Sequence, residues 1–189
     1  IYQDTPIGGK NFEDLCIDKI SEIAPNDLII EPTGTSIGLY DKKGDGVGLE
    51  VEAFEVPGKI ALWLEDESKG KDFGTQAGDT IGLRISSKEA GESFYYIPAC
   101  ARMTDDLANR IEGSKVVLFD GTLWQNDEMA SSRVGEKTGQ RMGHMNNSGK
   151  DGSIEAFKNL NIKRKIFIHI NTTNPILLGD SDERKIVEE

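Results

Sequence analysis

Two apolar segments in the last third of the chain each end abruptly in a side chain that can bind a metal or move a proton. Val116–Phe119 is followed by Asp120, and the apolar run that starts at Ile166 meets His169. Short continuous apolar runs of this kind are typical of strands buried on both faces of a sheet. Because functional groups collect on the loops just beyond strand ends, we expect Asp120 and His169 to share one catalytic or metal-binding site.

Each of these two residues also has a simpler structural explanation. Asp120 precedes Gly121-Thr122, so its carboxylate can hold a metal, orient a histidine, or cap a turn through its own backbone. His169 precedes four polar residues, 171–174, which can hydrogen-bond the second ring nitrogen of a metal-bound imidazole. A histidine buried in the strand end and bonded to backbone is the alternative for His169.

The only other histidine, His144, lies between these residues in sequence, in a loop with glycine on one side. Lys137 and Arg141 precede it and add positive charge to an acidic protein, which suits an anionic substrate or cofactor. Arg133 is a further cation of the same stretch. We therefore take Lys137, Arg141 and His144 as candidate cofactor-binding residues, with a solvated loop as the alternative.

The charge and cysteine content exclude several classes of protein. The net charge of -11 over 189 residues repels nucleic acid and anionic membrane surfaces. No apolar run approaches the ~20 residues of a membrane span. Cys16 and Cys100 have no metal-binding spacing, and free thiols in a reducing compartment predict a cytoplasmic protein. Cys100 follows a predicted strand, so its thiolate is a possible metal ligand, with a small buried side chain as the alternative.

The length suits one domain, 1–189, and the order of elements predicts an α/β protein with a sheet covered by helices, or two sheets stacked in a sandwich. Strands at 47–56 and 60–64 are expected to form a hairpin around Pro57-Gly58. Residues 65–78 are expected to be a long loop or flap. The remaining expected elements are helices at 11–24, 104–111, 151–160 and from 180 or 181, and strands at 28–30, 80–86, 93–98, 116–119 and 166–170.

Three long segments make the sequence similar to a known family: LFDGTLWQNDEM, KTGQRMGHM and IFIHINTTNPIL, beginning at Leu118, Lys137 and Ile166. They resemble the coenzyme PQQ biosynthesis protein B family of the metallo-β-lactamase-like superfamily, from about Val47 to Glu189. The resemblance implies an αββα sandwich with a metal site at one edge. It also implies that Asp120 and His169 are metal ligands, and that Cys100 stands near where many members place another histidine.

The resemblance also implies that the chain is incomplete. The His- and Asp-rich metal motif of the family belongs to its N-terminal half, and the chain begins at Ile1 without methionine and ends at Glu189 within a predicted helix. We therefore expect the C-terminal part of a longer protein. Such a part is expected to bind iron or zinc weakly or not at all and to be inactive alone.

For the complete protein, the resemblance implies a role in the biosynthesis of pyrroloquinoline quinone (PQQ). The expected reaction is metal-dependent oxidation, a hydroxylation, of the tyrosine in a Glu-Tyr precursor. The alternatives are a carrier that brings PQQ or its precursor to the periplasm and a metal-dependent hydrolase. The expected partner is a small molecule or short peptide, and a homodimer remains open.

Overall fold

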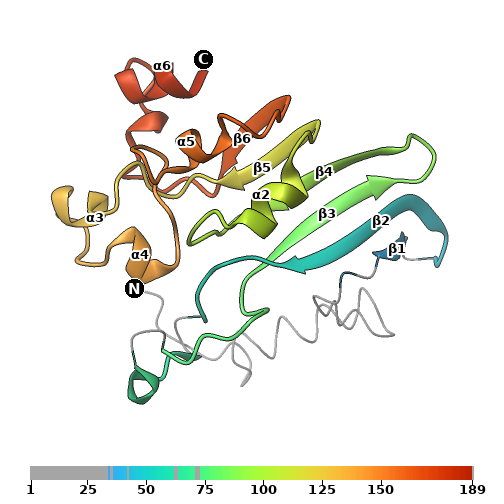
Figure 1. Ribbon diagram of the computed structural model, residues 1–189, viewed down its shortest axis with the longest axis horizontal. Coiled ribbons are helices and arrows are strands. Elements are labelled where there is room, and N and C mark those ends of the chain that lie inside the picture. Colours follow the sequence, from blue (N-terminus) through green and yellow to red (C-terminus); the bar gives the residue numbers. More distant parts are fainter. Residues whose placement is uncertain (1–33, 35, 42, 62–63, 71–72, 189) are drawn as a thin grey trace.

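The computed structural model describes residues 34, 36–41, 43–61, 64–70 and 73–188. The helix expected at 11–24 and the strand expected at 28–30 lie outside these residues. The described part is built on a six-stranded sheet whose strands follow one another in sequence order (Figure 1). The strands are β1 (Ser36–Tyr40), β2 (Gly46–Glu55), β3 (Ile81–Ser87), β4 (Glu92–Ile97), β5 (Val116–Asp120) and β6 (Arg164–Ile168).

The direction of the strands changes within the sheet. Strands β1 to β4 pair antiparallel, whereas β4 pairs parallel with β5 and β5 pairs parallel with β6. The parallel half needs crossover connections, and these carry most of the helices. Both predicted strand ends near the candidate site, those of β5 and β6, therefore point to the same edge of the sheet.

The predicted hairpin between 47–56 and 60–64 is wrong. Strand β2 instead pairs with β3, with Ala53 opposite Leu83. Gly58 does not make a hairpin turn: a Cβ there would lie 1.9 Å from Thr80 Oγ1, so glycine lets the chain pass close to Thr80. The backbone amide of Ile60 then donates to Thr75 Oγ1, and Ile60 is not part of a strand.

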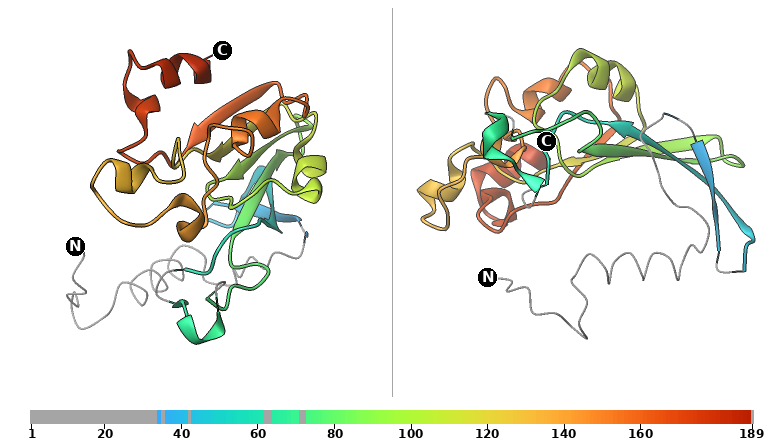
Figure 2. Two further views of the ribbon diagram at one scale, coloured as in Figure 1. Left: turned by 60° about the vertical axis from the view of Figure 1, so that its left-hand side comes forward. Right: turned by 90° about the horizontal axis from the view of Figure 1, so that it is seen from below.

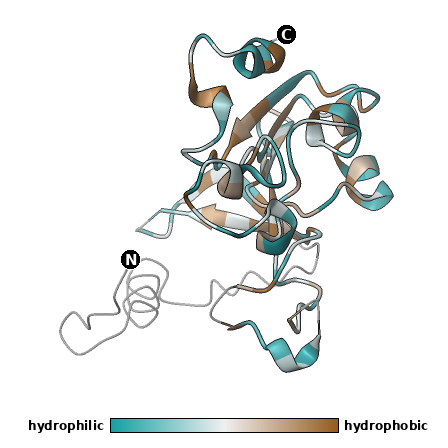
Figure 3. Cartoon of the chain, turned by 90° about the vertical axis from the view of Figure 1, so that its left-hand side faces the viewer, coloured by the Kyte–Doolittle hydropathy of each residue, from teal (hydrophilic) through white to brown (hydrophobic). Residues whose placement is uncertain are grey.

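One face of the sheet carries the core. Helices α2 and α5 lie over this face (Figures 1 and 2), and Leu107, Ile111 and Phe157 from them pack with sheet residues such as Ile97 and Phe119. In Figure 3 the hydrophobic colours lie mainly along the strands, and the loops around them are largely hydrophilic. The helices are η2 (Glu67–Lys69), α2 (Asp105–Ile111), α3 (Glu128–Ser131), α4 (Gly139–Met142), α5 (Ser153–Phe157), η3 (Pro175–Leu177) and α6 (Asp182–Glu188).

The predicted helix starts are confirmed where the capping chemistry is specific. The hydroxyl of Thr104 accepts from the Leu107 amide at the start of α2, and that of Ser181 accepts from the Arg184 amide at the start of α6. Helix α5 is shorter than the predicted 151–160. Among the residues that the structure describes, no helix is both long and apolar enough to cross a membrane.

The opposite face of the sheet is more open. Phe94 and Tyr96 of β4 alternate with the buried Tyr95 and Ile97, and they are 36% and 38% exposed. Within the described residues the strands form this one sheet, so the mixed α/β class is confirmed here as a single layer of strands with helices over its core face.

Candidate metal centre

Asp120 ends β5 as a fully buried carboxylate with four hydrogen bonds. Its Oδ1 accepts from the backbone amide of Thr122 at 3.1 Å and from the Thr122 hydroxyl at 2.6 Å. Its Oδ2 accepts from the amide of Cys100 at 2.9 Å and lies 2.7 Å from His144 Nδ1. Asp120 thus performs two of the roles weighed from the sequence: it caps the turn after the strand, and it orients a histidine.

The structure brings both histidines to this carboxylate and to Thr122. His169 Nδ1 lies 2.8 Å from Thr122 Oγ1, and His144 Nδ1 lies 3.1 Å from the same oxygen. The two imidazole rings are stacked, with centroids 5.3 Å apart and 18° between their planes. Asp120, His144 and His169 each offer one ligand atom, and these atoms all lie within 4.8 Å of one another.

The hydrogen-bond network assigns the protons on the two rings. The single hydroxyl proton of Thr122 goes to Asp120 Oδ1, because this contact at 2.6 Å is to a carboxylate and the one to the His169 carbonyl is 3.1 Å. Thr122 Oγ1 then accepts a proton from His169 Nδ1, and Asp120 Oδ2 accepts one from His144 Nδ1. The Nε2 atom of each ring has no hydrogen-bond partner in the described part of the chain, so in a neutral ring it offers the free lone pair.

Close packing fixes the loops that carry these residues. Gly121 follows Asp120 because a Cβ there would lie 2.8 Å from Phe167 Cβ and 3.0 Å from the Ile168 carbonyl of the neighbouring strand. The buried Asn174 donates to the Gly121 carbonyl at 2.9 Å, which joins the loop after β6 to the turn after β5. His169 itself has a φ of 55°, so the chain turns sharply as β6 ends and leaves this side chain exposed.

The donor set fits a transition metal such as iron or zinc. Two imidazole nitrogens and a carboxylate are ligands for both ions, and the Nδ1 protons leave Nε2 as the free donor of each ring. Asp120 is already committed to four hydrogen bonds, so its main contribution is to orient His144 directly and His169 through Thr122. Two imidazoles and one such carboxylate leave further coordination positions open.

The cations that the sequence suggested for anion binding do not join the cluster of Asp120, His144 and His169. Arg141 makes a bidentate ion pair with Glu65, at 2.9 and 2.7 Å, and its guanidinium lies 3.9 Å from the centre of the Phe73 ring. Lys59 contacts the same carboxylate and the same ring. Lys137 and Arg133 are exposed. Arg141 therefore holds the loop after β2 in place, and it is not a free anion-binding group.

Cys100 is a structural neighbour of the site. Its amide donates to Asp120, its thiol lies 3.2 Å from the Arg102 carbonyl, and the side chain is fully buried. Burial is the main cause that raises the pKa of the Cys100 thiol to about 12. Neutral thiols are poor metal ligands and poor nucleophiles, so the geometry favours the small buried side chain over the ligand.

This burial predicts an unreactive thiol. In a Cys16→Ser variant, which leaves Cys100 as the only cysteine, we expect no reaction with a disulfide reagent at pH 8 until urea unfolds the protein. The folded pKa exceeds the ordinary 9.0, so the contribution of this group to stability is complete below pH 9 and is lost as the pH rises towards 12. Stoichiometric labelling of the folded protein within minutes at pH 8 would contradict the buried position.

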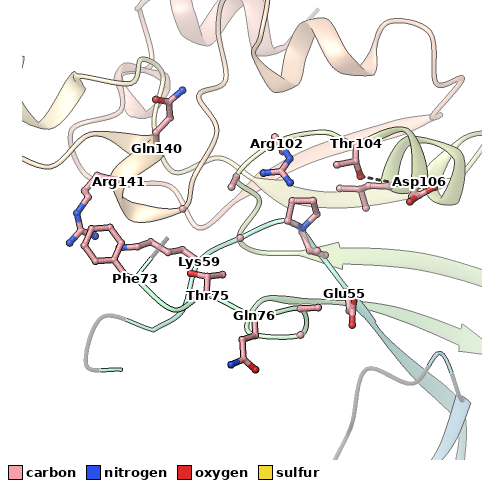
Figure 4. Close-up of a pocket in the computed structure, with 18 of the residues that line it drawn as sticks. Glu55, Lys59, Phe73, Thr75, Gln76, Arg102, Thr104, Asp106, Gln140 and Arg141 are labelled. Atoms are coloured by element: carbon pink, nitrogen blue, oxygen red, sulfur yellow. Dashed lines mark hydrogen bonds between the residues drawn. The ribbon is translucent and has the colours of Figure 1, made fainter. Parts of the chain in front are cut away.

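An open pocket of about 870 Å³ lies between the loop after β2, the segment before α2 and helix α4 (Figure 4). Two of its lining residues are linked to the cluster by short stretches of chain. Gly143 immediately precedes His144, and Arg102 follows two residues after Cys100, whose amide binds Asp120. Asp120, His144 and His169 themselves are not among the residues that line the pocket.

Sequence reasoning missed two residues that organise this region. Thr122 connects Asp120 with His169 through hydrogen bonds of its hydroxyl. The only signal for this role in the sequence was the position of Thr122 in the Asp-Gly-Thr turn, directly after the strand. Glu65 pairs with both Lys59 and Arg141, and nothing in the local sequence links it to a cation that is 76 residues away.

Comparison with known proteins identifies the superfamily to which the chain belongs. The Beta-lactamase superfamily domain matches residues 19–170, so the chain belongs to the beta-lactamase superfamily, and the predicted metallo-β-lactamase-like fold is confirmed. Within it, the chain is similar to Coenzyme PQQ synthesis protein B of Rhodopseudomonas palustris (strain TIE-1), with 49% identity over 146 residues that cover 77% of this chain and 47% of the relative. The protein of that name from Bradyrhizobium diazoefficiens is 50% identical over 162 residues, covering 84% and 52%.

A solved structure gives the same result. The crystal structure of Zn(2+)-bound PqqB from Methylobacterium extorquens superposes with a TM-score of 0.72 at 43% identity and covers 82% of this chain and 48% of that one. The chain spans about half the length of the relatives that it matches, which fits the expectation of a C-terminal part. The resemblance stated from the sequence is therefore confirmed.

Proposed function

We propose that this chain belongs to an enzyme of PQQ biosynthesis that carries out a metal-dependent hydroxylation of the tyrosine in a Glu-Tyr precursor. The observation that supports this proposal is the cluster of Asp120, His144 and His169, in a chain similar to Coenzyme PQQ synthesis protein B. The free thiol of Cys100 supports a cytoplasmic enzyme.

In this proposal the histidines hold the metal and Asp120 sets their orientation. When bound, a redox-active metal such as iron(II) supplies the activation of oxygen, and the open coordination positions suit that chemistry. Asp120 and Thr122 keep the Nδ1 proton on each ring and so present Nε2 to the ion. The pocket of about 870 Å³, whose lining includes Gly143 next to His144 in the chain, would hold the precursor.

A carrier of PQQ or its precursor is the second candidate, and the pocket of about 870 Å³ is the observation that favours it. Such a volume suits a small molecule, and simple binding needs no metal chemistry. A metal-dependent hydrolase, as in the superfamily, is the third candidate. A hydrolase would use zinc, whereas the hydroxylase would use iron.

Turnover under oxygen separates these functions. The polypeptide is expressed from its complete coding sequence, loaded with iron(II) or zinc(II), and supplied with a Glu-Tyr dipeptide or a peptide containing it. Ascorbate is added as a two-electron reductant, because one atom of O2 enters the ring and the other leaves as water. We expect a product with one added oxygen atom, only with iron and oxygen and not in His169→Ala. Cleavage of the peptide with either metal would support the hydrolase. Metal-independent binding of PQQ without turnover would support the carrier.

A further inference from the structure

Two asparagine side chains are buried in the loops that carry the candidate metal ligands. Asn147 and Asn174 are only 0% and 1% exposed. Asn147 lies shortly after His144 in the chain, and Asn174 lies shortly after His169. Because a buried amide group that lacks hydrogen bonds is costly, the partners of these two side chains must be supplied by the protein itself.

The amide NH2 group of each asparagine makes two hydrogen bonds to different parts of the fold. Asn174 Nδ2 donates to the Gly121 carbonyl at 2.9 Å and to Asn147 Oδ1 at 3.0 Å. Asn147 Nδ2 donates to the Asp120 carbonyl at 3.3 Å and to Ser153 Oγ at 3.4 Å. The pair therefore joins the turn after β5, both loops that carry histidines, and the start of α5.

The chain itself fixes the orientation of both amide groups. Asn174 Oδ1 accepts from the backbone amide of Ile176, which can only donate. Asn174 therefore turns its NH2 group towards the Gly121 carbonyl and Asn147, and Asn147 meets it with its oxygen. The NH2 group of Asn147 then faces the Asp120 carbonyl. Every N–H of the pair is used, so a single arrangement satisfies both side chains.

The two asparagines connect the loops whose relative position determines the separation of the histidine rings. The hydrogen bond between Asn147 and Asn174 runs directly from the loop of His144 to the loop of His169. Both side chains also bind the backbone of the turn that supplies the carboxylate beside His144. A zinc ion binds two imidazoles only when each nitrogen lies at about 2.0–2.1 Å from it, so a small shift of one loop against the other weakens binding.

We propose that Asn147 and Asn174 are positioning residues, which hold His144 and His169 at the separation that a metal ion requires. Neither asparagine is itself a ligand, and both act through the backbone of the loops that they join. This inference rests on the metal centre of the proposed function, but it does not depend on which reaction the metal supports.

Metal binding by a variant of nearly identical shape tests the positioning role. Asn174→Asp keeps the oxygen that accepts from the Ile176 amide. Its second oxygen replaces the NH2 group and faces the Gly121 carbonyl and Asn147 Oδ1, which repel it. We expect the affinity for cobalt(II) to fall about tenfold or more, since loss of an outer hydrogen-bond partner costs about 10–100-fold, and the visible absorption bands of the bound cobalt to change. Asn109→Asp, the same change at an exposed position of α2, should bind as the parent does.

Two further variants separate positioning from general stability. Asn174→Ser keeps a hydroxyl that can accept from the Ile176 amide and introduces no buried charge, so it should fold and also lose affinity. Val51→Ala, at a buried position of β2, should lower the free energy of unfolding and leave the affinity and the cobalt spectrum unchanged. All titrations are made without denaturant, at a temperature where circular dichroism shows that the variants are folded.

The polypeptide is expressed from its complete coding sequence, and the cobalt signal of this centre is the part that His169→Ala removes. Affinity and spectrum like those of the parent in the folded Asn174 variants would overturn the positioning role, as would an equal loss of affinity in Val51→Ala. A cobalt signal that His169→Ala leaves intact would refute the metal centre and the inference with it. Cobalt binding as expected, without hydroxylation by the iron form, would refute only the proposed reaction.

Discussion

Asp120→Ala is expected to destabilise the protein by about 3 kcal/mol or more. The carboxylate is fully buried and accepts from two backbone amides, those of Cys100 and Thr122, and from the Thr122 hydroxyl. Alanine leaves the two amides buried without a partner, at a cost of about 1–3 kcal/mol for each, whereas the Thr122 hydroxyl can still donate to the His169 carbonyl. Urea denaturation of parent and variant, followed by circular dichroism, measures the difference.

Two further variants make this result specific. Asp120→Asn keeps an acceptor at one oxygen position, so we expect a smaller loss than with alanine. Asp151→Ala removes an exposed carboxylate and should change the free energy of unfolding by less than about 0.5 kcal/mol. A loss below about 1 kcal/mol in Asp120→Ala would mean that Asp120 acts mainly as a metal ligand that folding does not need.

Loss of either histidine should have the largest effect on metal binding. His144→Ala and His169→Ala each remove one imidazole from a set of three ligand groups. We expect each to lower the affinity for zinc(II) or iron(II) by more than about 100-fold, because the loss of a hydrogen-bonded partner of a ligand alone costs about 10–100-fold. Anaerobic calorimetric titration measures both ions. The absolute affinity of the chain is expected to be weak, since three groups leave several positions to water.

A substitution of Thr122 is expected to lower the metal affinity by less than the loss of either histidine does. Thr122→Val removes the hydroxyl that receives the His169 proton, so we expect a loss of about 10–100-fold with both imidazoles still present. Thr172→Val makes the same chemical change on an exposed loop residue and should leave the affinity unchanged. If the histidine variants bind metal like the parent, the ion lies elsewhere and the site assignment fails.

The convergence of Asp120 and His169 could be foreseen because it depends on topology. Parallel strands that end together place their next residues at one edge of the sheet, and the apolar runs of β5 and β6 were readable in the sequence. The role of His144 was predicted only in part. Its glycine-containing loop indicated that His144 is a site residue, but the sequence led us to assign His144 to cofactor binding and not to the metal-ligand cluster.

Other features depend on partners far apart in sequence. The apolar run at 60–64 resembles a strand by composition, yet strand β2 pairs with β3. The backbone amide of Lys59, between β2 and this run, donates to the hydroxyl of Thr80. Local composition cannot distinguish these outcomes. The charge of Arg141 suggested anion binding, and only the packing shows that Glu65 already occupies that guanidinium.

The change from antiparallel to parallel pairing at β4 also has a consequence for the order of folding. Residues 88–91 alone separate β3 from β4, whereas residues 121–163 separate β5 from β6. Closing the longer connection costs about 2 kcal/mol more in chain entropy. The β3–β4 hairpin can therefore form early and act as the nucleus, while the pairing of β5 with β6 comes late. His144 and His169 meet only in that final step, so an ion that binds them would act on the unfolding rate rather than on the folding rate.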